Sequence, residues 1–199
     1  MKLSLRTVII VFAAIECLSV VPAFAFDLKE KNEYLIDVRG DDGDIYLNRF
    51  SLHKKFDPVG LEMSAFGETQ WNFDINDWEK LLLGAETGKF FFGRLYIGQS
   101  AQFISGQIMD HMTFESDNPS FDTTTKIGLT FPVIRYFSVN ISEEYSFNLE
   151  EGEGEYAEIL ADLNYSAVDS YSIGIGWHHT DRIHSFDSDY VSISFALNF

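Results

Sequence analysis

The sequence predicts an all-β fold: an antiparallel transmembrane β-barrel of ten strands, preceded by a cleaved leader. Three observations carry this prediction. Apolar and polar side chains alternate along most segments, short turns alternate with longer acidic loops, and no apolar run after residue 25 is long enough for a membrane helix. Successive side chains of a strand point to opposite faces, so the alternation predicts a sheet with one apolar and one polar face.

The N-terminus has the features of a secretory signal peptide. Lys2 and Arg6 precede a short apolar run, and Ala23-Phe24-Ala25 supplies a small-x-small cleavage site. The apolar run is too short for a spanning helix, which needs about 20 residues. We therefore expect a leader over residues 1–25 and a single domain over residues 26–199.

The strongest strand pattern is at the C-terminus. Val191, Ile193, Phe195, Leu197 and Phe199 share one face, whereas smaller and polar residues share the other. We expect the apolar face to contact lipid and the polar face to line the barrel lumen.

Nine further segments complete the predicted barrel. They span residues 33–39, 44–55, 61–71, 81–85, 90–103, 124–131, 137–147, 157–165 and 171–177. Ten is an even number, which brings both termini to the same side of the membrane. Eight strands are the alternative, if the weak first or fourth segment is not a full strand.

Two classes of connection alternate between these segments. Short turns are predicted at residues 57–60, 86–88, 132–134 and 168–170, and longer, mostly acidic loops at 40–43, 72–77, 105–121, 150–155 and 181–189. Barrels of the Gram-negative outer membrane have short periplasmic turns and longer extracellular loops. The sequence therefore predicts an outer-membrane location with both termini in the periplasm.

Charged residues interrupt the polar faces of several predicted strands. An unpaired charge in a narrow lumen is costly, so we expect the basic groups to pair with the acidic ones. The predicted lumen network consists of Glu68, Arg94, Lys126, Glu144, Glu158 and Asp162. Ten strands are too few for an open aqueous channel of the large porin type, which needs about 16.

The overall charge is strongly acidic. The chain has 31 Asp and Glu residues against 14 Lys and Arg, a formal net charge of -17. This balance argues against a nucleic-acid partner, whose phosphates would be repelled. Acidic loops could share Mg²⁺ or Ca²⁺ with lipopolysaccharide phosphates, although solubility is the simpler explanation. We expect no other cofactor, and Cys17 lies in the predicted leader, which excludes thiolate metal sites from the mature chain.

The ending Tyr190-Val191-Ser192-Ile193-Ser194-Phe195-Ala196-Leu197-Asn198-Phe199 resembles the C-terminal signal of outer-membrane barrel proteins. That signal is a terminal Phe preceded by alternating apolar and aromatic residues, and the barrel assembly machinery reads it. Together with the leader, the resemblance implies transit past periplasmic chaperones and insertion among outer-membrane lipids and lipopolysaccharide.

The stretch Trp177-His178-His179-Thr180-Asp181 resembles, more weakly, a His-x-Ser-Asn motif of the lipid A 3-O-deacylase family of small outer-membrane barrels. The resemblance implies His178 as general base and Thr180 as nucleophile. Three departures count against it: Thr180 replaces Ser, no Glu follows to orient the base, and strand parity turns His178 toward the lumen rather than toward lipid.

A second cluster surrounds the same strand end. His178, His179, His184, Asp181, Asp187 and Asp189 could bind a metal ion, but their spacing matches no metal motif, and we predict no metal site there. The sequence thus favours a non-enzymatic outer-membrane barrel with a structural or surface-interaction role. A deacylase-like hydrolase and a narrow channel for small solutes are the alternatives.

Overall fold

The computed structural model describes residues 26–40, 42–56, 59–106, 108–110, 113–115, 120–183 and 187–199. The predicted leader at residues 1–25 lies outside the described residues, so it remains a prediction. Within the described part of the chain, no helix is both long and apolar enough to cross a membrane.

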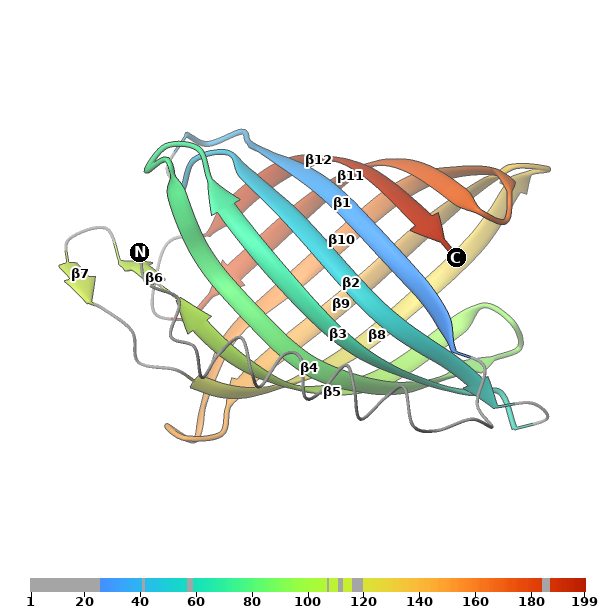
Figure 1. Cartoon of the computed structure of the whole chain (residues 1–199), viewed down its shortest axis with the longest axis horizontal. Coiled ribbons are helices and arrows are strands. Elements are labelled where there is room, and N and C mark those ends of the chain that lie inside the picture. The colour runs from blue at the N-terminus through green and yellow to red at the C-terminus, as the bar shows by residue number, and fades with distance from the viewer. Residues whose placement is uncertain are drawn as a thin grey trace.

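Ten antiparallel strands close into a barrel, in the order β1-β12-β11-β10-β9-β8-β5-β4-β3-β2 (Figure 1). The predicted count of ten is confirmed over the alternative of eight. The barrel strands are β1 (Asp27–Asp37), β2 (Ile45–Phe56), β3 (Leu61–Asn72), β4 (Asp77–Phe91), β5 (Leu95–Gly106), β8 (Ser120–Ile134), β9 (Phe137–Asn148), β10 (Glu153–Val168), β11 (Tyr171–Arg182) and β12 (Ser188–Asn198).

The first and last strands close the barrel. β1 pairs with β12 from Lys29 opposite Asn198 to Asp37 opposite Tyr190. The backbone N–H of Phe199 adds a hydrogen bond of 2.8 Å to the carbonyl oxygen of Leu28. The C-terminus and the start of β1 therefore lie at one end of the barrel, which also carries the short turns and is called the turn end below (Figure 1). The opposite end is the loop end.

The outer wall is a belt of exposed apolar side chains. The predicted apolar faces form it, including Ile193 and Phe195 of β12, which are 51% and 40% exposed. Other strands contribute Phe50, Met63, Leu81, Leu83, Ile97, Phe103, Ile127, Leu129, Ile141, Ile159, Leu163, Ile173, Ile175 and Trp177. A water-soluble protein rarely exposes a continuous apolar surface of this size, whereas a membrane barrel must. The protein is thus an all-β transmembrane barrel of the outer-membrane type.

A polar cluster interrupts this belt on β1 and β2. On the outward faces of β1 and β2, Asn32 donates to Glu30 at 3.1 Å, and Asn48 donates to Asn32 at 2.8 Å and to Glu30 at 3.3 Å. The hydroxyl of Tyr46 also donates to Asn32. The four side chains thus satisfy one another, which reduces the cost of placing them on a face that meets lipid.

The turn between β4 and β5 differs from the prediction. β4 runs straight through residues 86–88 to Phe91, and the chain reverses at Phe92 and Gly93, whose φ angles are +54° and +67°. Gly88 lies inside the sheet, opposite Gly98, and a Cβ there would lie 2.1 Å from the hydroxyl oxygen of Tyr96. The glycine marks a close side-chain approach, so the turn predicted at 86–88 is wrong.

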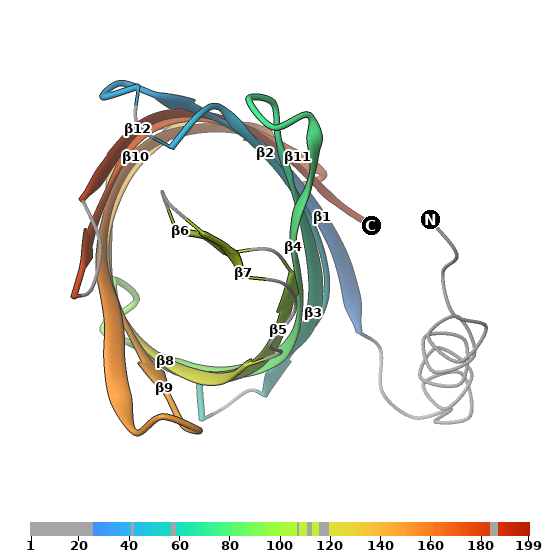
Figure 2. The same ribbon diagram turned by 90° about the vertical axis from the view of Figure 1, so that its left-hand side faces the viewer.

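The β5–β8 connection carries its own short hairpin, formed by β6 (Ile108–Asp110) and β7 (Thr113–Glu115). The hairpin extends beyond the strand ends in Figure 1 and lies within the outline of the barrel when the loop end faces the viewer in Figure 2. Its backbone therefore projects over the mouth at the loop end.

Candidate functional site in the barrel lumen

Ion pairs between neighbouring strands line the lumen. On β2 and β3, Nε of Arg49 lies 2.8 Å from Oε2 of Glu68. On the opposite wall, Lys126 of β8 pairs with Glu144 of β9. These pairs result from strand register, since Arg49 lies opposite Glu68 and Lys126 lies opposite Glu144. Opposite charges on facing positions stabilise a sheet and offset the cost of placing each charge inside the barrel.

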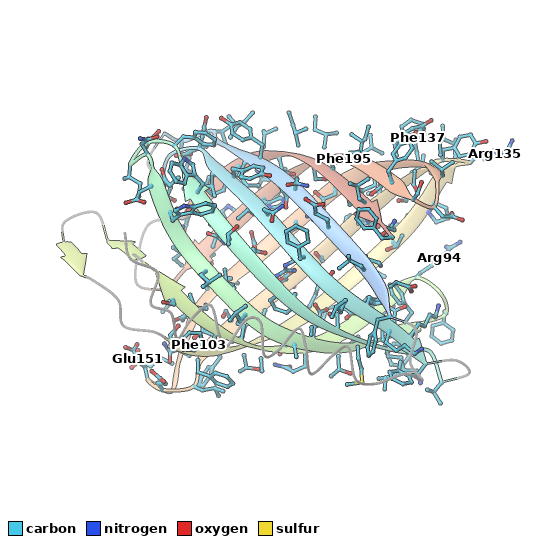
Figure 3. All side chains as sticks on the ribbon, in the orientation of Figure 1. Arg94, Phe103, Arg135, Phe137, Glu151 and Phe195 are labelled. Carbon is cyan, nitrogen blue, oxygen red and sulfur yellow. The ribbon has the colours of Figure 1, made fainter. Side chains whose placement is uncertain are left out.

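The structure places Arg94 outside this network. Arg94 lies in the β4–β5 turn and is exposed, as the side-chain view of the turn end shows (Figure 3). The sequence placed it in the lumen because residues 90–103 read as one strand, whereas the chain reverses within that segment. Arg49 is the cation that pairs with Glu68 instead.

Alternation on β2 did not reveal Arg49. Near the loop end the lumenal face of β2 carries Ile45 and Leu47, while its outward face carries Asn48. Polar and apolar residues therefore exchange faces halfway along the strand, and sequence alone could not assign Arg49 to a side. Its contact with the ring of Phe66, 4.3 Å from the guanidinium carbon to the ring centroid, fixes the side chain over β3.

Side chains fill the middle of the lumen incompletely. The side chains of Lys31, Arg49 and Lys126 are 43%, 37% and 35% exposed, although all three point inward. Part of the lumen is therefore wide enough for water beside these charges.

A second lumenal cluster surrounds His178 of β11. The Nε2 atom of His178 lies 3.5 Å from Oε1 of Glu33 and 3.6 Å from Oδ1 of Asp162. Its Nδ1 atom lies 3.6 Å from Oε1 of Glu158. The imidazole is 3% exposed, and within the described residues neither Nε2 nor Oε1 of Glu33 has a hydrogen-bond partner. Three carboxylates thus face one buried ring.

Small residues allow this convergence. Glu33 belongs to β1 and must reach across β12 to His178, and β12 presents Ser192 and Ser194 to the lumen there. On β11, Gly176 leaves space for its neighbour Asp162, because a Cβ at Gly176 would lie 1.9 Å from Oδ1. Replacing either the serines or the glycine by larger residues would separate the carboxylates from the ring.

The two residues of the hydrolase hypothesis share one face of β11. Thr180 lies opposite Glu158 of β10 and Ser188 of β12, two positions nearer the loop end than His178. A shallow apolar hollow near Trp177 lies on the other side of the strand, lined by Val139, Ala161, Leu163, Ile175, Trp177 and Val191. An acyl chain from the surrounding leaflet would meet this outer hollow, whereas His178 faces the lumen.

The residues weighed as a metal-binding loop do not converge in the described structure. Nδ1 of His179 lies 2.9 Å from Oδ1 of Asp189, and the His179 ring stacks on Trp177 with centroids 5.6 Å apart. His179 therefore lies on the outer side, away from His178. Asp181 is exposed, and His184 lies outside the described residues.

Charged contacts between distant loops tie the loop end together. Arg182 lies 3.1 Å from Oδ2 of Asp42, which also accepts a hydrogen bond from the hydroxyl of Ser188. Arg39 pairs with Asp189. These contacts join the β1–β2 loop to the ends of β11 and β12 and rigidify the acidic rim of the mouth.

Comparisons with known proteins identify no family for this chain. No family model matches the chain, and no curated protein matches it. Among solved structures, an outer-membrane channel from Pseudomonas putida matches with 8% identity over 90% of this chain and 97% of that one, with a TM-score of 0.49.

Two porin structures are similar to a comparable degree. The NanC porin is 9% identical over 88% of this chain and 100% of that one, and the KdgM porin is 10% identical over 87% and 99%; both TM-scores are 0.47. At these identities and TM-scores, the likenesses identify no solute, activity or partner for this chain.

Proposed function

We propose that this protein is a narrow, charge-lined channel of the outer membrane that passes small hydrophilic solutes and prefers cations. The observation that carries the proposal is the unfilled space beside inward charges in mid-barrel, where the side chains of Arg49 and Lys126 keep 37% and 35% of their surface accessible. A lumen packed only for structural support would leave no such space.

Charge supports the cation preference. The chain has a net charge of -17, and carboxylates line both the mouth and the lumen. A narrow path with low-dielectric walls concentrates this potential and raises the local concentration of cations. The same field disfavours anionic solutes.

A planar lipid bilayer tests the channel directly. We expect purified, refolded protein to give discrete conductance steps in KCl, with a reversal potential of the cation-selective sign under a salt gradient. Glu144→Gln should weaken the selectivity because it removes a lumenal charge. The matched control is Glu143→Gln, whose exposed side chain lies between Ile127 and Ile159 on the outer face and should leave conductance unchanged.

A folded barrel that never conducts would contradict the channel. The remaining role would then be structural or surface-interacting, and deletion of the gene should alter envelope permeability or surface binding without any solute selectivity.

The orientation and lipid partners belong to the same proposal. With both termini in the periplasm, the acidic loop end faces outward, where Mg²⁺ or Ca²⁺ could bridge carboxylates such as Glu150 and Glu151 to lipopolysaccharide phosphates. Protease added to intact cells should cut the loop end and spare a tag placed at either terminus. Cleavage of a terminal tag would reverse the orientation.

A further inference from the structure

We propose that Glu33, Asp162 and His178 form a binding site in the lumen for one divalent transition-metal ion of the zinc class. Among the described residues, these three form the group of potential ligands whose donor atoms all lie within 4.8 Å of one another. The inference deepens the proposed channel, because an ion held there would occupy the solute path.

The distances fit coordination better than direct hydrogen bonding. N–H···O hydrogen bonds are about 2.7–3.2 Å long, and the Nε2 atom of His178 lies 3.5 and 3.6 Å from its two carboxylate oxygens. Ligand atoms that surround zinc tetrahedrally at about 2.0–2.2 Å are roughly 3.3–3.6 Å apart. The two distances from Nε2 therefore match the edges of such a tetrahedron, and the carboxylate oxygens of Glu33 and Asp162 lie within 4.8 Å of each other.

The unsatisfied atoms point to the same centre. Oε2 of Glu33 accepts a hydrogen bond from Lys31 at 2.7 Å, which leaves Oε1 buried and, among the residues that the structure describes, without a hydrogen-bond partner. Nε2 of His178 is also without one. A buried carboxylate oxygen and a buried imidazole nitrogen rarely remain unsatisfied, and a cation between them would satisfy both.

The surrounding residues supply what a metal site requires. The carboxylate of Glu158 lies 3.6 Å from Nδ1 of His178, which is longer than a hydrogen bond, but its negative charge favours a proton on Nδ1 and so leaves Nε2 free as a ligand. Asp162 is 23% exposed on its side chain, so the lumen provides an entry path and space for a water ligand. The imidazole selects zinc-like ions over Mg²⁺ and Ca²⁺, which prefer oxygen ligands.

Isothermal titration of the refolded, chelator-stripped barrel with ZnCl₂ tests the site. We expect one site per barrel that Mg²⁺ in excess does not displace. His178→Ala should weaken zinc binding at least tenfold. His179→Ala and His53→Ala are the matched controls, since His179 faces outward and His53 faces a single carboxylate, Glu62, 3.6 Å away.

A pair of glycine variants tests the geometry without removing a ligand. Gly176→Ala should weaken binding strongly because its Cβ displaces the ligand Asp162, whereas Gly174→Ala on the same face should weaken it less, because its Cβ meets Ser194 and Asn164 and no proposed ligand. X-ray absorption of the zinc-loaded protein should show one nitrogen and two carboxylate oxygens in the first coordination sphere.

The outcomes separate this inference from the channel proposal. Zinc binding that survives His178→Ala, or no binding by a folded barrel, would overturn the metal site whether or not the protein conducts. Binding that depends on His178 in a barrel without conductance would support the site and overturn the channel alone. If both hold, micromolar zinc should block conductance in the original protein and not in His178→Ala.

Discussion

The Nε2 atom of His178 lies 3.5 Å from Oε1 of Glu33, although the strands that carry them, β11 and β1, are separated by β12. The contact exists only because the barrel closes and because β12 presents serines between the two side chains. The cluster of carboxylates around His178 is therefore built across β1 and β12, the two strands whose pairing closes the barrel.

The pair of Arg49 and Glu68 should stabilise the barrel. Arg49→Ala removes the cation beside Glu68, which is 11% exposed and keeps a hydrogen bond from Gln70, and we expect a loss of about 1–3 kcal/mol, less than for a fully buried pair because the Arg49 side chain is partly accessible. Urea unfolding in lipid vesicles, followed by tryptophan fluorescence, measures the change. The double variant Arg49→Met with Glu68→Leu should recover most of the stability. If it loses as much stability as Arg49→Ala, the effect does not originate in the ion pair.

Gly88 should be intolerant of any side chain. Its Cβ would meet the Tyr96 ring, and the Tyr96 hydroxyl donates to Glu86 at 2.6 Å, so the ring cannot move freely. We expect Gly88→Ala to cost about 1–3 kcal/mol in the same unfolding assay. In a Tyr96→Ala background, Gly88→Ala should be nearly neutral. If the stability losses of the two single variants simply add in the double variant, the Tyr96 ring is not the obstacle.

Phe199 should matter for assembly more than for stability. Its side chain is 69% exposed, so Phe199→Ala removes little packing, although the terminal Phe is the main feature of the predicted assembly signal. We expect a fall in the amount of barrel inserted in cells and unchanged urea stability of refolded protein. Normal insertion in cells would contradict the signal.

The hydrolase hypothesis predicts an activity that the lumenal placement of His178 disfavours. We expect the folded protein to release no fatty acid from lipopolysaccharide, measured by mass spectrometry alongside an active deacylase as positive control. Release that disappears in His178→Ala and in Thr180→Ala would reinstate the hydrolase.

Regular alternation made the barrel predictable. In β12 the odd-numbered residues from Val191 to Phe199 are apolar, and the structure turns Ile193 and Phe195 outward as expected. The same rule, applied to neighbouring strands, gave the strand count and the inward direction of His178. Alternation is informative wherever one face meets lipid, because a shift of one residue would exchange the two faces.

The rule failed where local chemistry competes with it. On β2, inward Leu47 and outward Asn48 hid the inward Arg49. Gly88 suggested a turn at residues 86–88 because glycine occurs both in turns and at close contacts within sheets. With the turn placed too early, residues 90–103 became one predicted strand, and Arg94 was assigned to its lumenal face. Glu33 was missed for another reason: its partners are set by the register of barrel closure, which no local pattern encodes.

Pairing of β1 with β12 also constrains how the protein can form. Contacts between the first and last strands have the greatest sequence separation in the chain, and such contacts slow folding because chain entropy must be lost before they form. Until β12 is in place, β1 and β11 each expose an open strand edge. The carboxylates around His178 are consequently incomplete in every partly synthesised chain. Glu33 reaches His178 only when β1 pairs with β12, which is the step that closes the barrel.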